Sequence, residues 1–160
     1  MVDFKKDTWL YALIAAVLAI ISIFTPWGSY TLAITGQTVN IQTWLGGVVS
    51  YYESEIAGIP EGWNGSGLSL YTFAFVIASI TLLLYFSIRT FRGTEFKWDW
   101  LVYLLTGVVM LIFTILTLAL EAVEDATIGF APIGLIISSV LAIIAFIFEK
   151  FGDKLFGRGE

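Results

Sequence analysis

Four long stretches of this sequence contain no charged side chain, and they constrain its fold more than any other feature. They cover residues 8–52, 62–88, 100–120 and 126–148. An α-helix rises about 1.5 Å per residue, so roughly 20 apolar residues cross the hydrocarbon core of a bilayer. The last three stretches each fit one crossing. In the first stretch, Pro26 and Gly28 interrupt the helical pattern after a dense apolar run.

We therefore predict an all-α membrane protein, a four-transmembrane-helix bundle that forms a single domain over residues 1–160. The predicted spans lie at about 9–26, 68–88, 100–120 and 128–148. In this prediction the chain is embedded in the lipid bilayer, which is one of its partners.

Composition excludes several other classes of protein. Of the 160 residues, 58% are apolar and only 13% are charged, which is about half the charged share of a soluble domain. The net charge of −5 argues against a nucleic-acid partner, because nucleic acids are bound by basic surfaces. The chain has no Cys and no His, so thiolate and imidazole groups are missing as ligands and as nucleophiles. No catalytic motif is present, and we predict a protein that is not an enzyme and has no metal or cofactor.

The basic residues are confined to three segments that an even number of spans places on one side of the membrane. All eight Lys and Arg residues lie within residues 5–6, 89–97 and 150–158. Basic loops remain in the cytoplasm, so we predict an integral plasma (cell) membrane protein with both termini cytoplasmic. The other two loops hold no base, and we expect them to give the outer surface a negative field. Their acids are Glu53, Glu55, Glu61, Glu121, Glu124 and Asp125.

The long outer loop, residues 27–67, has the pattern of a small extracellular β-sheet, whereas the second outer loop, 121–127, is short. Apolar and polar residues alternate over residues 30–34 and again over 39–42, on either side of Gly36. Alternation with period two around a short glycine-containing turn is typical of a β-hairpin. Residues 46–52 can add a third strand, and the acidic remainder of the loop is predicted to be irregular. Asn64 in this loop begins a glycosylation sequon.

With these features the chain resembles the claudin and peripheral-myelin-protein superfamily of four-span proteins. Trp27 follows the first span, as a Trp does in claudins. Trp44 with Gly46 loosely matches the Trp-Gly-Leu-Trp-like element further along the claudin loop, although the paired cysteines of that loop are absent. The resemblance implies an outer sheet on a four-helix bundle and a role in cell adhesion or membrane assembly.

Small residues recur at four-residue spacing in the predicted spans. The longest series is Gly134, Ser138 and Ala142. This spacing places the three residues on one helix face, where two backbones can approach closely. Such a face can pack inside the bundle, or it can bind a second copy of the chain or another membrane protein.

The middle of each predicted span has no charge, His, Asn or Gln, and its polar side chains are hydroxyls. Because ion and proton transport need titratable or coordinating groups at depth, we predict a non-catalytic integral membrane protein with a structural, adhesion or membrane-assembly role of claudin-like type. An accessory subunit of a larger membrane complex is one alternative. A channel or transporter for neutral or lipid-like molecules is another.

Overall fold

The computed structural model describes residues 7–34, 37–52, 62–64, 67–94, 97–120 and 126–156, which form four helices and a small sheet. The helices are α1 (Thr8–Ile23), α2 (Gly67–Phe91), α3 (Asp99–Leu120) and α4 (Phe130–Phe156). The strands are β1 (Gly28–Ile34), β2 (Gln37–Trp44), β3 (Gly47–Tyr52), β4 (Gly62–Asn64) and β5 (Thr127–Ile128). The prediction of a mainly helical bundle with a small sheet is confirmed.

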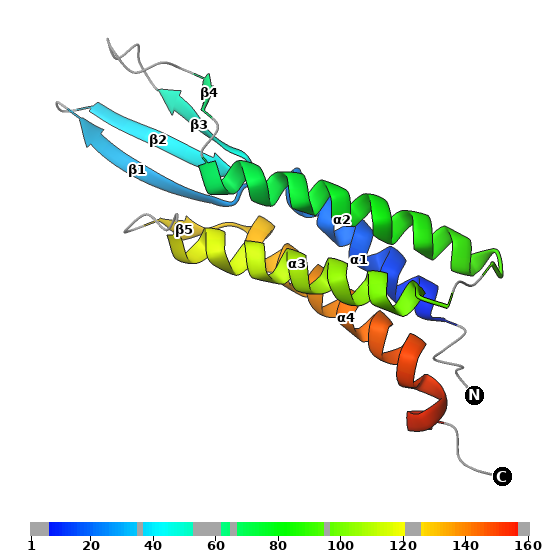
Figure 1. Cartoon of the computed structure of the whole chain (residues 1–160). Helices are drawn as coiled ribbons and strands as arrows, with labels where there is room; N and C mark the ends of the chain where they lie inside the picture. The colour runs from blue at the N-terminus through cyan, green and yellow to red at the C-terminus, as the bar shows by residue number, and fades with distance from the viewer. Residues whose placement is uncertain are drawn as a thin grey trace.

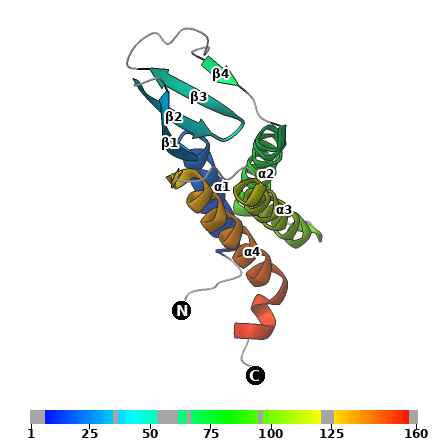
Figure 2. The ribbon, with the colours of Figure 1, turned by 90° about the vertical axis from the view of Figure 1, so that its left-hand side faces the viewer.

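The helices lie side by side, and the sheet projects from one end of the bundle (Figures 1 and 2). Helix α1 packs against α2 and α4, and α3 packs against the same two helices, so the four form a ring in chain order. Helix α1 begins and α4 ends at the end opposite the sheet (Figure 1). The long connection from α1 to α2, which contains most of the sheet, therefore leaves and re-enters the bundle at the same end.

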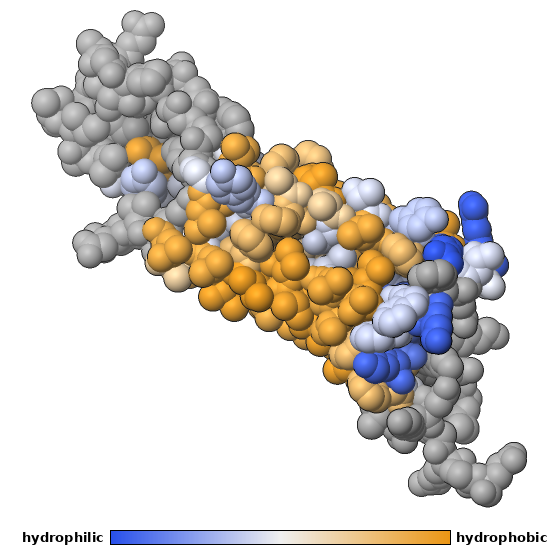
Figure 3. All heavy atoms as spheres, in the orientation of Figure 1, coloured by the Kyte–Doolittle hydropathy of each residue, from blue (hydrophilic) through white to orange (hydrophobic). Residues whose placement is uncertain are grey.

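The interior of the bundle holds many small and hydroxyl-bearing side chains beside a few large ones such as Leu83, Met110 and Leu135, whereas many bulky aliphatic side chains face outward. On α1, four alanines are fully buried while Ile14 and Ile21 are 41% and 45% exposed. Outward-facing apolar residues on the other helices complete the apolar band seen in Figure 3. A water-soluble bundle buries its large aliphatic side chains. On α1 the arrangement is the inverse, which suits lipid, where helices associate through close packing of small residues.

Three helices, α2, α3 and α4, are long and apolar enough to cross a membrane. Helix α1 is equally apolar but has only 16 residues and ends at Ile23, before the end of the span predicted at 9–26. The cause is local, because Pro26 disfavours a helical conformation at the residue before it. The last turn also tightens, since the Phe24 amide donates to the Ile21 carbonyl at 3.1 Å.

Hydroxyl groups connect neighbouring helices across the interior. The Ser138 hydroxyl donates to the Ala15 carbonyl at 2.6 Å, which joins α4 to α1, and the Ser87 hydroxyl donates to the Trp9 carbonyl at 2.8 Å, which joins α2 to α1. Several other interior hydroxyls donate to a carbonyl one turn back on their own helix: Ser22, Thr72, Thr106 and Ser139. Hydrogen bonds between membrane helices average about 0.6 kcal/mol, so these bonds set the register of the helices more than they drive association.

Candidate functional site

The sheet has the strand order β4-β3-β2-β1-β5, and every pair of neighbours is antiparallel. The register pairs Tyr30 with Ile41 and Leu32 with Val39, so the two apolar series lie opposite each other where β1 pairs with β2. The predicted hairpin and third strand are confirmed.

Two short strands at the sheet edges were not predicted from the sequence. Strand β4 lies within the stretch predicted to be irregular, and it pairs with β3. Strand β5 lies in the second connection, and it pairs with Gly28 and Ser29 of β1. Strands of three and two residues are too short to show an alternating pattern, and each forms because a longer strand offers it an edge.

The first attachment of the sheet to the bundle joins the end of α1 to the start of α4. The Trp27 amide donates to the Thr43 carbonyl at 2.7 Å, and the Gly129 amide donates to the Trp27 carbonyl at 2.8 Å. The Ala131 amide in the first turn of α4 donates to the Pro26 carbonyl at 3.2 Å. Backbone groups at both helix ends therefore receive partners from the sheet junction, and α1, β1, β5 and α4 form one connected unit.

Glycine is required at this attachment because the backbones approach closely. A Cβ atom at Gly129 would overlap the Pro26 carbonyl oxygen, and one at Gly28 would lie 2.8 Å from the Thr127 carbonyl oxygen. Neither neighbour is a flexible side-chain tip, so neither can move aside cheaply. The sequence shows these glycines but does not show which backbone each one meets.

The second attachment places the turn between β2 and β3 on the start of α2. Leu45 is only 5% exposed and belongs to the core of the bundle. The Gly46 amide donates to the Ser69 hydroxyl at 2.8 Å. Gly46 has a φ of +92°, and its Cβ position lies 3.3 Å from the Phe73 ring, so both conformation and space call for glycine. The position singled out by its resemblance to claudins therefore has a structural role in this chain.

Removal of the Ser69 hydroxyl should loosen this second attachment. Ser69→Ala leaves the buried Gly46 amide without its acceptor, which costs about 1–3 kcal/mol of folding free energy. We expect a lower melting temperature in detergent and faster hydrogen exchange at the Gly46 amide. Thr81→Ala is the matched control, because the exposed Thr81 hydroxyl bonds only within α2, to the Ile77 carbonyl. Equal exchange rates at Gly46 in the two variants would contradict this role of Ser69.

The remaining residues singled out from the sequence fall in different places. Trp27 and Trp44 are partly buried at the two attachments, and Trp27 packs against the core. Asn64 is the last residue of edge strand β4. The predicted acidic surface lies outside the described residues: Glu53, Glu55, Glu61, Glu121, Glu124 and Asp125.

The small-residue face of α4 packs against α1 inside the chain. A Cβ atom at Gly134 would overlap the Ser22 hydroxyl, Ser138 bonds to the Ala15 carbonyl, and Ala142 is fully buried. Ala142 also lies against α3, because a Cβ atom at Gly107 would be 3.2 Å from its side chain. In this structure the face is therefore covered by the chain's own helices α1 and α3.

Over most of the length of the bundle, the buried polar groups of the described residues are hydroxyls. Among the described residues, the buried polar side chains are Ser and Thr, together with Asp99 at the first position of α3. No group of three or more His, Cys, Asp or Glu side chains in the described part of the chain could hold a metal ion. The organised feature that remains is the sheet, fixed to the bundle at two attachments.

These features define a class, a helical protein with three helices long and apolar enough to cross a membrane and a small sheet carried at one end of the bundle. No protein-family model matches the chain, and no curated protein matches it in sequence.

Proposed function

We propose that this chain is a non-catalytic structural or adhesion protein of the plasma membrane, of claudin-like type, that acts through its sheet. In this proposal all four helices cross the bilayer, the sheet is extracellular, and both termini are cytoplasmic. The observation that carries the proposal is the double attachment of the sheet, through Gly129 to α1 and α4 and through Gly46 to α2. A sheet held in this way presents a fixed surface, which a binding role requires and a flexible loop does not provide.

The distribution of charge supports this orientation. The described basic residues Arg89, Arg92, Lys97 and Lys150 belong to the ends of α2, α3 and α4 that lie opposite the sheet. Segments rich in Lys and Arg stay in the cytoplasm. The loops on the sheet side of the helices carry acids and no base, so the sheet would face outward.

Helix α1 is proposed as the fourth span because of its neighbours. It packs along α2 and α4, both long enough to cross a membrane. Its 16 residues rise about 24 Å, somewhat less than the hydrocarbon core, and its outward face carries Ile14 and Ile21 among other exposed apolar residues. Lipid around the bundle would cover this apolar face.

The second candidate function, an accessory subunit of a larger membrane complex, is favoured by one observation on α2. Ala74 and Ala78 are exposed on its outward face, whereas the small residues of α1 and α4 are buried within the chain. Small residues on an exposed face allow another membrane helix to approach closely.

Vesicle tethering tests the adhesion proposal directly. The purified full chain is reconstituted with the sheet outward, and the vesicles are mixed with identical vesicles that carry a second dye. We expect tethering several-fold above that of empty vesicles. The matched control is the same protein reconstituted with the sheet inward, which should give no more tethering than empty vesicles. Equal tethering for the two orientations would contradict adhesion through the sheet.

The mass of the intact particle, extracted from its native membrane in mild detergent, separates the two candidates. A particle that contains only this chain is expected from the adhesion proposal. A complex with another protein in fixed ratio would contradict the adhesion proposal and support the accessory-subunit function.

A further inference from the structure

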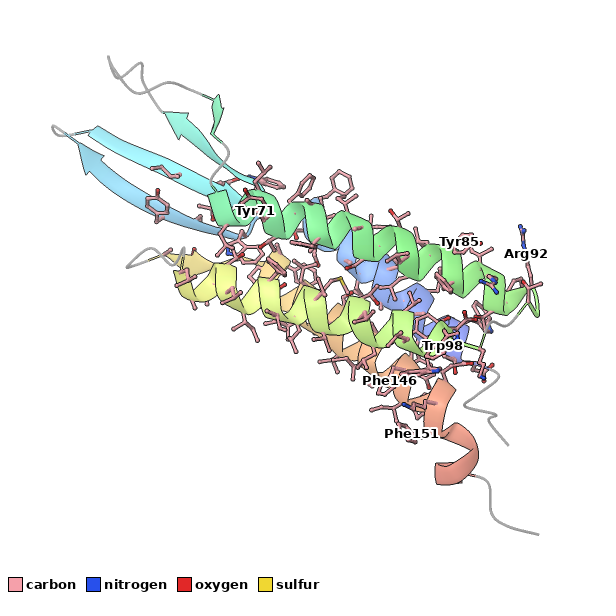
Figure 4. All side chains as sticks on the ribbon, viewed as in Figure 1. Tyr71, Tyr85, Arg92, Trp98, Phe146 and Phe151 are labelled. Atoms are coloured by element: carbon pink, nitrogen blue, oxygen red, sulfur yellow. The ribbon has the colours of Figure 1, made fainter. Side chains whose placement is uncertain are left out.

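Lys150 lies among aromatic side chains at the end of the bundle opposite the sheet. Its Nζ atom is 3.8 Å from the centroid of the Trp100 ring, 5.5 Å from that of Phe151 and 5.8 Å from that of Phe146. Trp98 stacks on Trp100 with a centroid distance of 6.1 Å. We call these five residues the Lys150 cluster. Figure 4 shows Trp98 beside Phe146 and Phe151, where the start of α3 meets the later turns of α4.

The aromatic rings hold the lysine ammonium in place and do not occupy all of its N–H donors. A cation over the face of a ring is attracted by the ring quadrupole. An ammonium has three N–H donors, and rings do not replace an anionic acceptor. Lys150 is exposed, so its outward donors can reach a ligand. The cluster is therefore a positioned positive charge whose geometry exists before any ligand binds.

The depth of the cluster points to the chemistry of that ligand. The uncharged stretch of α4 ends at Phe148, directly before Glu149 and Lys150, and α3 begins at Asp99, so Lys150 lies where the apolar band ends. Trp98 is 50% exposed at the same level. Tryptophan prefers the headgroup region of a bilayer, where the abundant anionic group is the phosphate of a phospholipid. Two further exposed basic residues, Arg92 and Lys97, lie near this end.

We propose that the Lys150 cluster binds the headgroup phosphate of an anionic phospholipid. Lys150 supplies the charge, and the rings of Trp100, Phe146 and Phe151 fix its position, while the exposed ring of Trp98 lies against the lipid. The acids closest in sequence are Glu149, which precedes Lys150, and Asp99, which is 1% exposed and so cannot contact the headgroup directly. The proposal depends on α3 and α4 spanning a bilayer and is independent of adhesion through the sheet.

Lipid titration of the purified full chain in detergent tests the proposal. Dioctanoyl phosphatidylglycerol is the anionic probe, dioctanoyl phosphatidylcholine is the zwitterionic one, and tryptophan fluorescence reports binding. A basic residue near an anionic lipid surface contributes enough affinity that Lys150→Gln should weaken phosphatidylglycerol binding about fivefold. Lys97→Gln is the matched control, because it removes the same charge near the same end and keeps the Lys150 cluster intact. It should change the affinity less than twofold.

A second variant separates the positioned charge from charge alone. Trp100→Leu keeps the ammonium and removes the ring 3.8 Å from it, and we expect a loss of affinity comparable to that of Lys150→Gln. Equal weakening by Lys150→Gln and Lys97→Gln, or no weakening by either, would overturn the proposal. So would phosphatidylcholine binding as tight as that of phosphatidylglycerol. Displacement of the lipid by millimolar inorganic phosphate would show a free-phosphate site in place of a lipid site.

Discussion

Replacement of Gly134 by valine is expected to separate α4 from α1 and to destabilise the bundle. A Cβ atom at this position would overlap the Ser22 hydroxyl and lie 3.0 Å from the Phe130 ring. Ser22 is fully buried and donates to the Leu18 carbonyl at 2.8 Å, so it cannot move aside without losing its own hydrogen bond. Overpacking of this kind costs about 1–3 kcal/mol, and occasionally more.

Thermal denaturation of the purified protein in detergent measures this effect. For Gly134→Val we expect a melting temperature lower by roughly 5–10 °C, since each kcal/mol corresponds to about 2–4 °C in a chain of this size. Gly67→Val is the matched control, because apart from chain neighbours no atom of the described residues lies within 4 Å of the Cβ position of Gly67, the first residue of α2. If both variants melt at the same temperature, close packing at Gly134 does not hold the bundle together.

Gly129→Ala is expected to detach the sheet from the bundle on the side of α1 and α4. The added methyl group would overlap the Pro26 carbonyl oxygen and lie 3.0 Å from the Trp27 carbonyl carbon. The same stretch of backbone accepts hydrogen bonds from the Gly129 and Ala131 amides, so relief of the overlap breaks both. Each lost hydrogen bond destabilises by about 0.5–1.5 kcal/mol, or more where a buried group is left without a partner.

Hydrogen exchange distinguishes loss of this attachment from general unfolding. In Gly129→Ala, exchange at the amides of Gly28 and Ser29 should rise at least tenfold, while the amides in the middle of α3 keep their protection. Gly67→Ala should leave both regions unchanged. Uniformly faster exchange throughout the chain would show that the attachment cannot be separated from the fold of the bundle. If adhesion acts through the sheet, Gly129→Ala should also lower vesicle tethering.

Much of the architecture could be predicted because the helices and the first hairpin each have a strong pattern in the local sequence. Uncharged stretches of helical length predict the helices that α2, α3 and α4 form, and alternation around Gly36 predicts the pairing of β1 with β2. The end of α1 was predicted at residue 26 and lies at Ile23, because hydropathy does not register the conformational effect of Pro26. Strand β5 was missed because its pairing partner Gly28 is a hundred residues distant in sequence.

The roles of individual side chains were harder to predict because they depend on contacts between elements. The spacing of Gly134, Ser138 and Ala142 indicates a packing face, but only the arrangement of helices shows that α1 and α3 cover it. Gly46 was singled out by the resemblance of the loop to that of claudins. Its positive φ and its hydrogen bond to Ser69 depend on the folded structure and have no signal in the local sequence. Likewise Lys150 and Trp100 lie on different helices, and their contact has no signal in either local sequence.

The double attachment of the sheet also determines how the molecule carries mechanical load. A pull applied to the sheet reaches α1 through the peptide chain, α4 through the Gly129 and Ala131 amides, and α2 through the bond between Gly46 and Ser69. Helices α1 and α4 are in turn joined by the Ser138 hydroxyl, halfway along the bundle. Tension is therefore divided among three helices, and the sheet has no single hinge about which it can swing.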